Sequence, residues 1–309
     1  MTDFSSKNDL ARNNNQVITA IPTLFDHNDK VDLFKMSTLI EFQIDNGIKA
    51  IIVGGSTGEL LLLKKNEYLD LIKFIKNKYS DKLNIIGCCT SASTSDSIQQ
   101  ANNLRELGIK SILCATPFYV KPNQAGIFEH FKLISEVLPT IIYSVPSRTA
   151  NDMDMSTIKN LSNLNGIIGY KDATNDVSRT LVLSKYVKEQ NLNFKIFAGD
   201  DISYLGFAAS GANGLISVIS NIFPKIVNDI ADLISQNDFI NARQKFFSII
   251  PHILVANLET NPIVIKYMLH KIFPEINYQC RKPLSSISEL VRVKCDDLFN
   301  KSANLFINS

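Results

Sequence analysis

The stretch Ser111–Tyr143, SILCATPFYVKPNQAGIFEHFKLISEVLPTIIY, contains the unit from which most of the chain is built. It begins with an apolar run over Ser111–Ala115 and ends with another over Thr140–Tyr143. Between them, Gln124–Val137 places apolar residues at the 3.6-residue period of a helix. Continuously apolar short runs are typical of strands buried on both faces of a parallel sheet. The stretch therefore predicts a strand, a helix and a second, parallel strand.

Six further runs of this kind lie on either side of the stretch. They are Gln16–Ile21, Ala50–Val53, Asn84–Cys89, Gly166–Tyr170, Phe194–Phe197 and Gly214–Val218. Successive runs begin 20 to 34 residues apart, which leaves room for a crossover helix each time. Eight regular strand–helix units favour an α/β fold of the closed (β/α)8 TIM-barrel type over an open doubly wound sheet.

The strands stop at about Asn221, and only helical patterns follow. The predicted helices are Asn221–Ser235, Asp238–Leu258, Pro262–Ile272 and Ser285–Asn300. The first can serve as the eighth barrel helix, so we predict a barrel over residues 16–236 and a C-terminal helical appendage over 237–309. Residues 1–15 are polar and lack the apolar stretch of a secretory signal, and we predict a flexible tail there.

The composition excludes several classes of function. The chain has 309 residues, of which 45% are hydrophobic, with 32 Lys and Arg against 30 Asp and Glu. This near balance gives no reason to expect nucleic acid or an anionic membrane as a partner. No apolar run approaches the roughly 20 residues that span a bilayer. Five cysteines and four histidines without metal-like spacing suit a cytoplasmic protein that holds no metal.

Catalytic groups of such barrels lie at the carboxyl ends of the strands, which directs attention to Lys171 and Tyr143. Lys171 follows the run Gly166–Tyr170. Burial there would favour the neutral amine, which can form a Schiff base with a ketone; the alternative is a structural lysine paired with Asp172 or another carboxylate. Tyr143 ends the neighbouring strand and could relay protons. Its alternative role is a core tyrosine that bonds to the backbone.

Two loops after strands offer groups for an anionic substrate. The loop after the second strand contains Gly55, Ser56 and Thr57, whose hydroxyl and N–H groups suit a carboxylate or a phosphate. A plain tight turn before a helix would explain the same residues. Arg148 follows the fifth strand and could bind a substrate carboxylate with its guanidinium fork; it could equally be a surface arginine.

Further candidate residues lie in or after the fourth, seventh and eighth strands. Tyr119 stands next to Phe118 after the fourth strand, where packing would also explain the aromatic pair. Ile216 lies in the eighth strand. Asp200 and Asp201 follow the seventh strand and are better explained as a helix N-cap than as a metal pair.

Several ordered motifs together carry a resemblance to a known family. They are Gly55–Glu59 (GSTGE), Thr116–Tyr119 (TPFY), Tyr143–Pro146 (YSVP), Gly169–Asp172 (GYKD) and Glu259–Pro262 (ETNP). With them the chain resembles the dihydrodipicolinate synthase / N-acetylneuraminate lyase family of Schiff-base-forming (β/α)8 enzymes, over about residues 16–300. Pro146–Thr149 (PSRT) resembles the synthase branch, because sialic-acid lyases and sugar-acid aldolases usually lack the arginine equivalent to Arg148.

The resemblance implies a mechanism that needs no metal or organic cofactor. Lys171 would condense with the C2 carbonyl of pyruvate, while Ser56 and Thr57 hold the pyruvate carboxylate. Tyr143 would shuttle protons together with Ser56. Tyr119 would complete the relay from a neighbouring subunit, so the resemblance also implies self-association as a homodimer or homotetramer.

The resemblance further implies the second substrate and the product. Arg148 would bind the carboxylate of L-aspartate 4-semialdehyde, and Gly55 and Ile216 would also line the substrate site. The product would be 4-hydroxy-tetrahydrodipicolinate, in the first committed step of lysine and diaminopimelate biosynthesis.

Two alternatives stay open from the sequence. One is an aldolase or lyase of the same superfamily that acts on a 2-keto-3-deoxy sugar acid. The other is a catalytically silent barrel that binds a keto acid. The second is motivated by Val120, Ser144, Ala150 and Asp172, which stand where the family usually has Asn, Asn, Gly and Glu.

Overall fold

A computed structural model describes residues 16–302 and residue 305, so the predicted tail over residues 1–15 lies outside the described residues. Eight parallel strands follow one another from β1 to β8 in a closed barrel. The predicted (β/α)8 barrel with further C-terminal helices is therefore confirmed.

The eight strands coincide with the eight apolar runs of the sequence. Their bounds are β1 (Gln16–Ala20), β2 (Ala50–Ile52), β3 (Asn84–Cys88), β4 (Ser111–Ala115), β5 (Thr140–Ser144), β6 (Ile167–Asp172), β7 (Lys195–Ala198) and β8 (Gly214–Ser217). Every residue of β4 and β5 is buried, as continuous apolar runs require. β6 extends two residues beyond its predicted run, so Lys171 and Asp172 lie within the strand.

The contacts within the chain divide the described residues into two compact units. The first unit contains Gln16 and residues 84–216. The second unit contains residues 17–83, residues 217–302 and residue 305.

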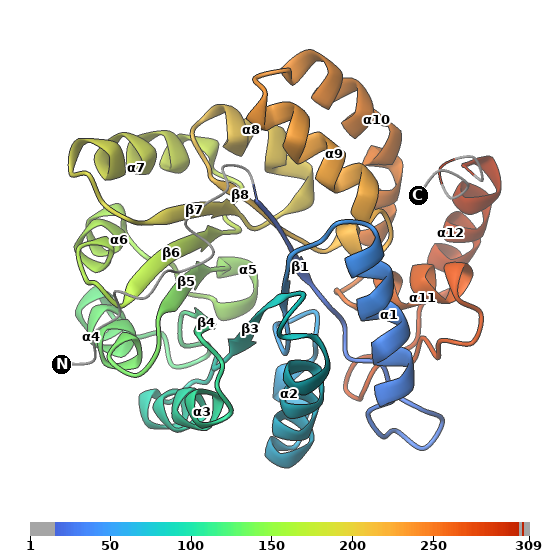
Figure 1. Cartoon of the computed structure of the whole chain (residues 1–309), viewed down its shortest axis with the longest axis horizontal. Coiled ribbons are helices and arrows are strands. Elements are labelled where there is room, and N and C mark those ends of the chain that lie inside the picture. The colour runs from blue at the N-terminus through green and yellow to red at the C-terminus, as the bar shows by residue number, and fades with distance from the viewer. Residues whose placement is uncertain (1–15, 303–304, 306–309) are drawn as a thin grey trace. The chain divides into compact units, whose positions relative to one another are not determined.

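Helices of the first unit alternate with β3 to β8. They are α3 (Thr94–Glu106), α4 (Gln124–Ser135), α5 (Pro146–Thr149), α6 (Met155–Ser162), α7 (Val177–Glu189) and α8 (Tyr204–Ala209). α3 packs against α4, α4 against α6, and α6 against α7 (Figure 1). Asp200 accepts a hydrogen bond from the N–H of Ile202 and so caps a short 3-10 helix over Asp201–Ser203, as the N-cap interpretation predicts.

The second unit holds β1, β2 and six helices among the described residues. These are α1 (Leu33–Asp45), α2 (Lys65–Tyr79), α9 (Pro224–Ser235), α10 (Phe239–Ala256), α11 (Ile263–Ile272) and α12 (Glu289–Lys301), with short 3-10 helices η2 (Leu60–Leu62) and η4 (Ile219–Asn221). The last four helices are those predicted, although α9 and α12 begin later. In α9 a proline occupies the first helical position, where it costs no hydrogen bond.

α9 and α10 lie side by side (Figure 1). Val227, Ile230, Ala231 and Ile234 form the buried stripe of α9, with the spacing of a single helix face. Over the described residues, no helix combines the length and the apolar character needed to cross a membrane.

Candidate active site

Lys171 lies in β6 with its side chain buried. It is paired in register with Tyr143 of β5 and with Phe197 of β7. Only 5% of Lys171 is exposed, and its Nζ lies 4.4 Å from the centroid of the Tyr143 ring. A buried ammonium group over an aromatic face retains some cation–π stabilisation but loses most of its hydration. The structure therefore brings the two strongest predicted residues into direct contact.

Burial lowers the pKa of Lys171 from 10.5 to about 8. The Cys88 thiol of β3 and the carboxylates of Asp200 and Asp201 act in the opposite direction, whereas the positive charge of Arg148 adds to the lowering. With a pKa of about 8, about 10% of the amine is neutral at pH 7, compared with about 0.03% for an unperturbed lysine. Lys171 can therefore act as a nucleophile near neutral pH.

The Asp172 side chain forms its contacts on the opposite face of the sheet from Lys171, because successive strand residues point to opposite faces. Its Oδ1 accepts hydrogen bonds from the N–H (2.9 Å) and hydroxyl (2.6 Å) of Thr174. Its Oδ2 lies 3.8 Å from Nε of Arg179. The alternative of a structural Lys171–Asp172 ion pair is thus wrong in this structure.

Arg148 is exposed on the short helix α5, directly after β5. The next residue anchors this helix: the Thr149 hydroxyl accepts from the hydroxyl of Thr116 (3.1 Å) and lies 2.9 Å from the carbonyl oxygen of Asn151. Because Thr116 follows β4, this bond joins the ends of two strands. Arg148 is therefore exposed on a helix whose last residue is anchored, a setting that suits a residue that binds a carboxylate.

Tyr119 has a different setting from the other aromatic residues of the site. It is 89% exposed, and its backbone is left-handed, with φ of 69°. A left-handed aromatic residue is uncommon and is maintained only where the surrounding structure requires it. Ile216 of β8 is fully buried in the same unit.

The loop with Gly55, Ser56 and Thr57 belongs to the second unit, where it is tightly folded. It follows Gly54, whose φ is 79° and whose Cα lies so close to the Tyr68 ring that a Cβ atom would be 2.4 Å from a ring carbon. Ser56 is exposed, whereas Thr57 is buried. The Thr57 hydroxyl oxygen accepts a hydrogen bond from the Asn261 side chain (2.9 Å), which leaves its own proton available to donate.

The structure thus brings Lys171, Tyr143 and Arg148 together in one unit and Gly55, Ser56 and Thr57 together in the other. The sequence interpretation missed Cys88, which interacts electrostatically with Lys171, and Asn261, which binds Thr57. Cys88 ends a predicted strand and Asn261 lies in a motif of the resemblance, so position could have indicated both.

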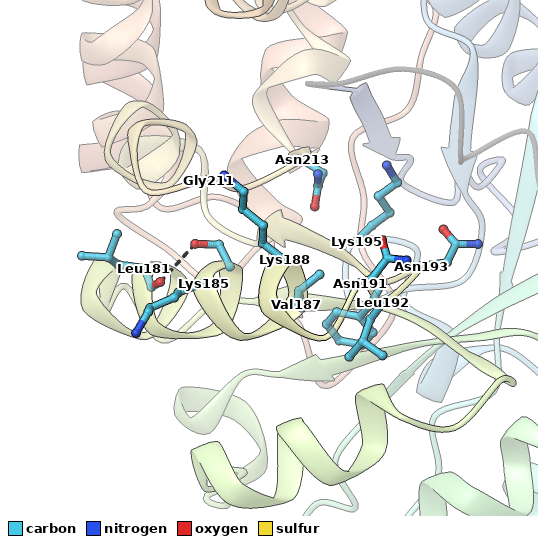
Figure 2. A pocket seen from close by; sticks show the side chains of 12 residues that line it. Leu181, Lys185, Val187, Lys188, Asn191, Leu192, Asn193, Lys195, Gly211 and Asn213 are labelled. Carbon is cyan, nitrogen blue, oxygen red and sulfur yellow. Dashed lines mark hydrogen bonds between the residues drawn. The ribbon is translucent and has the colours of Figure 1, made fainter.

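A separate pocket lies elsewhere in the first unit (Figure 2). It is lined by residues from α7 to the start of β7, among them Lys185, Lys188 and Lys195, and by Gly211 and Asn213, which precede β8. Lys195 is the first residue of β7, whereas Lys171 is paired with Phe197 near the other end. This pocket is therefore not part of the Lys171 site. Within residues 16–302 and 305, no three histidine, cysteine or acidic side chains form a group that could hold a metal ion.

Comparison with known proteins identifies the class. A barrel with a buried, low-pKa lysine in its sixth strand is typical of Schiff-base aldolases and lyases, and residues 13–301 match the dihydrodipicolinate synthetase family. The chain belongs to this family. A 4-hydroxy-tetrahydrodipicolinate synthase from Rickettsia typhi is 35% identical over 275 residues, covering 88% of this chain and 92% of the relative. One from Buchnera aphidicola is 36% identical over 260 residues, covering 84% and 87%.

Solved structures give the same result. The 4-hydroxy-tetrahydrodipicolinate synthase of Methylacidiphilum fumariolicum superimposes with a TM-score of 0.90 at 29% identity, covering 95% of this chain and 97% of the other. The dihydrodipicolinate synthase of Acinetobacter baumannii in complex with pyruvate has a TM-score of 0.88 at 30% identity, covering 94% and 98%.

Proposed function

We propose that this protein is a cytoplasmic 4-hydroxy-tetrahydrodipicolinate synthase that condenses pyruvate with L-aspartate 4-semialdehyde in lysine and diaminopimelate biosynthesis. The observation that carries the proposal is the buried Lys171, with its pKa of about 8, in contact with the Tyr143 ring. Relatives of this name at 35% and 36% identity support the choice of reaction within the family.

In the proposed reaction, neutral Lys171 attacks C2 of pyruvate to form a carbinolamine. Loss of water from it, with one proton taken up from Tyr143, gives a protonated imine. Loss of a proton from C3 produces an enamine, with the imine nitrogen as the electron sink. The enamine carbon then attacks the aldehyde carbon of the semialdehyde and a new carbon–carbon bond forms. The amino group of the second substrate displaces Lys171 from C2, which closes the ring and regenerates the amine.

The other predicted residues have roles that follow from these steps. Tyr143 supplies and removes protons at the carbinolamine, since its ring already contacts the lysine. Ser56 and Thr57, with backbone groups at Gly55, bind the pyruvate carboxylate, and the proton that Thr57 does not use toward Asn261 is donated to it. Arg148 binds the carboxylate of the semialdehyde, and Ile216 lines the site.

We propose that Tyr119 acts in the site of a second copy of the chain. An aromatic side chain that is 89% exposed on a left-handed backbone is positioned to contact a partner surface. The active form would then be a homodimer or homotetramer, and a monomeric variant would lose activity even with Lys171 intact.

An assay of substrate choice tests the proposal against the sugar-acid alternative. Pyruvate is supplied with aspartate semialdehyde or, separately, the cleavage of 2-keto-3-deoxy sugar acids is followed. The proposal predicts turnover with the semialdehyde and little with the sugar acids, because the exposed Arg148 provides the carboxylate-binding group. Faster turnover of a sugar acid would contradict it, and turnover of neither would favour the silent barrel.

A further inference from the structure

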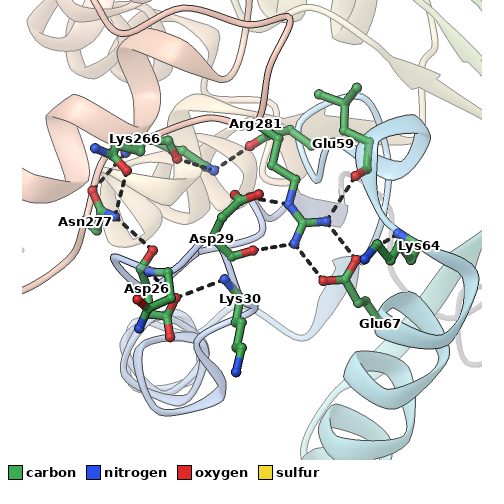
Figure 3. Close-up of polar contacts among 12 residues, drawn as sticks. Asp26, Asp29, Lys30, Glu59, Lys64, Glu67, Lys266, Asn277 and Arg281 are labelled. Carbon is green, nitrogen blue, oxygen red and sulfur yellow. Dashed lines mark hydrogen bonds and ion pairs between the residues drawn. The ribbon is translucent and has the colours of Figure 1, made fainter.

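A fully buried ion pair joins the predicted carboxylate-binding loop to the C-terminal helices. The carboxylate of Glu59, the last residue of the GSTGE motif, binds the ammonium group of Lys266 in α11. Both side chains are 0% exposed, and 207 residues separate them in the sequence. Figure 3 shows the pair within a larger polar cluster of the second unit. Burying two charges is costly, so such a pair requires close partners on every side.

Each member of the pair has those partners. The second carboxylate oxygen of Glu59 accepts from the backbone N–H of Arg281 (2.8 Å). Lys266 also donates to the carbonyl oxygen of Gln279 (3.0 Å), and its Nζ lies 4.3 Å from the centroid of the Phe25 ring. Each member of the ion pair therefore has a further hydrogen bond beside the pair itself, and these bonds hold Glu59 in one orientation.

Arg281 holds the chain that follows the loop (Figure 3). Its guanidinium binds both oxygens of Glu67, at 2.6 and 2.8 Å, and donates to the carbonyl oxygen of Leu62 at 3.0 Å. These bonds lower the pKa of Glu67 to about 2, so the pair is charged at all ordinary pH values. Arg281 thus ties the end of η2 and the start of α2 to the same C-terminal segment that binds Glu59.

Two further hydrogen bonds hold the loop at Thr57 and at the following residue, Gly58. Asn261, two residues before α11, donates to the Thr57 hydroxyl oxygen, and Thr23 donates to the carbonyl oxygen of Gly58 (2.7 Å). Glu59 has a left-handed backbone with φ of 55°, a conformation that a glutamate adopts only when its surroundings require it. The loop geometry therefore depends on contacts from outside the loop.

We propose that Lys266 is a positioning residue for the keto-acid site: by pairing with Glu59 it fixes the loop so that Ser56 and Thr57 face the substrate carboxylate. The inference rests on the proposed function, because it assigns this loop to pyruvate. It gives the C-terminal helices a role in substrate binding as well as in stability.

The test measures how Lys171 is trapped by borohydride as pyruvate is varied. Lys266→Met leaves the Glu59 carboxylate buried without its counter-ion, and the loop is expected to shift. Because a displacement of about 1 Å can cost on the order of 100-fold, the pyruvate concentration at half-maximal trapping should rise about 10- to 100-fold. Trapping at saturating pyruvate should change much less, since Lys171 itself is unaltered.

Two further variants separate positioning from folding. In Glu59→Gln/Lys266→Met both charges are absent. The pyruvate concentration at half-maximal trapping should therefore return part of the way toward the wild-type value. Lys271→Met is the matched control, because Lys271 lies in the same helix and pairs with Asp296 (2.9 Å) without contacting the loop. Lys271→Met should leave the pyruvate concentration at half-maximal trapping unchanged, even if it lowers the melting temperature. If Lys266→Met does not fold, Glu59→Gln alone should still raise the pyruvate requirement.

The outcomes are distinct. An unchanged pyruvate requirement in Lys266→Met, or in Glu59→Gln where that variant replaces it, overturns the inference, as does an equal rise in Lys271→Met. Failure of the wild-type protein to form any adduct would instead contradict the proposed function.

Discussion

Replacing Lys171 with methionine should stabilise the folded protein near neutral pH. The wild-type chain buries an ammonium group whose pKa is about 8 in the folded state. Its ordinary value is 10.5, so the folded state binds the proton less tightly than the unfolded state. Folding therefore disfavours the protonated form of Lys171, which lowers the free energy of unfolding. This reduction is fully present below pH 8 and disappears as pH rises through 10.5.

The size of the effect follows from the shift. The difference between a pKa of 10.5 and one of about 8 corresponds to about 3 kcal/mol, nearly all of it present at pH 7. At pH 10, about 1 kcal/mol remains by the same relation. The advantage of Lys171→Met in free energy of unfolding should therefore shrink by about 2 kcal/mol between pH 7 and pH 10. Methionine fills a similar volume, so cavity effects contribute little to this difference.

Urea unfolding of both proteins at pH 7 and pH 10, at one fixed protein concentration, measures this difference. Lys73→Met serves as the control, because Lys73 is exposed on α2 and meets water in the folded and unfolded states alike. An advantage of Lys171→Met that is constant with pH, or that grows toward pH 10, would refute the argument that burial sets the pKa of this lysine.

The other predictions concern the reaction. The rate of Schiff-base formation with pyruvate should rise with pH and level off with an apparent pKa of about 8, since only the neutral amine attacks; a rise that continues toward 10.5 would speak against the buried site. Tyr143→Phe keeps the ring against Lys171 but lacks the hydroxyl, so kcat should fall about 10²- to 10⁴-fold in steady-state assays while the pyruvate adduct still forms. Arg148→Ala should raise KM for aspartate semialdehyde about 10- to 150-fold, the equivalent of a charged hydrogen bond of about 1.5–3 kcal/mol. Its effect on pyruvate trapping should be much smaller, because Arg148 acts there only by lowering the pKa of Lys171; an equal effect on both substrates would contradict its assignment.

The strands and the lysine could be predicted from the sequence because their signals are local. A strand buried on both faces must be apolar at every residue, as β4 and β5 are, so each appears as a short unbroken run. A lysine directly after such a run, as Lys171 is after Gly166–Tyr170, stands out against the apolar background.

The contacts that hold the site could not be predicted in the same way. Glu59 and Lys266 are separated by 207 residues, and the fold alone brings them together. In the sequence, Lys266 looks like one polar residue in a predicted helix, although it is fully buried. The left-handed backbone of Tyr119 likewise has no signal in the sequence, because Tyr is not a residue type that favours this conformation. Contacts between residues so far apart in the sequence can be identified only from the structure.

The proposed reaction requires that Lys171 forms a Schiff base with pyruvate. Incubation of the protein with pyruvate and borohydride, followed by mass mapping of the peptides, shows whether it does. We expect a single reduced pyruvate adduct on Lys171, and none in Lys171→Met. Folded protein that forms no adduct, or an adduct on another lysine, would contradict the proposed function.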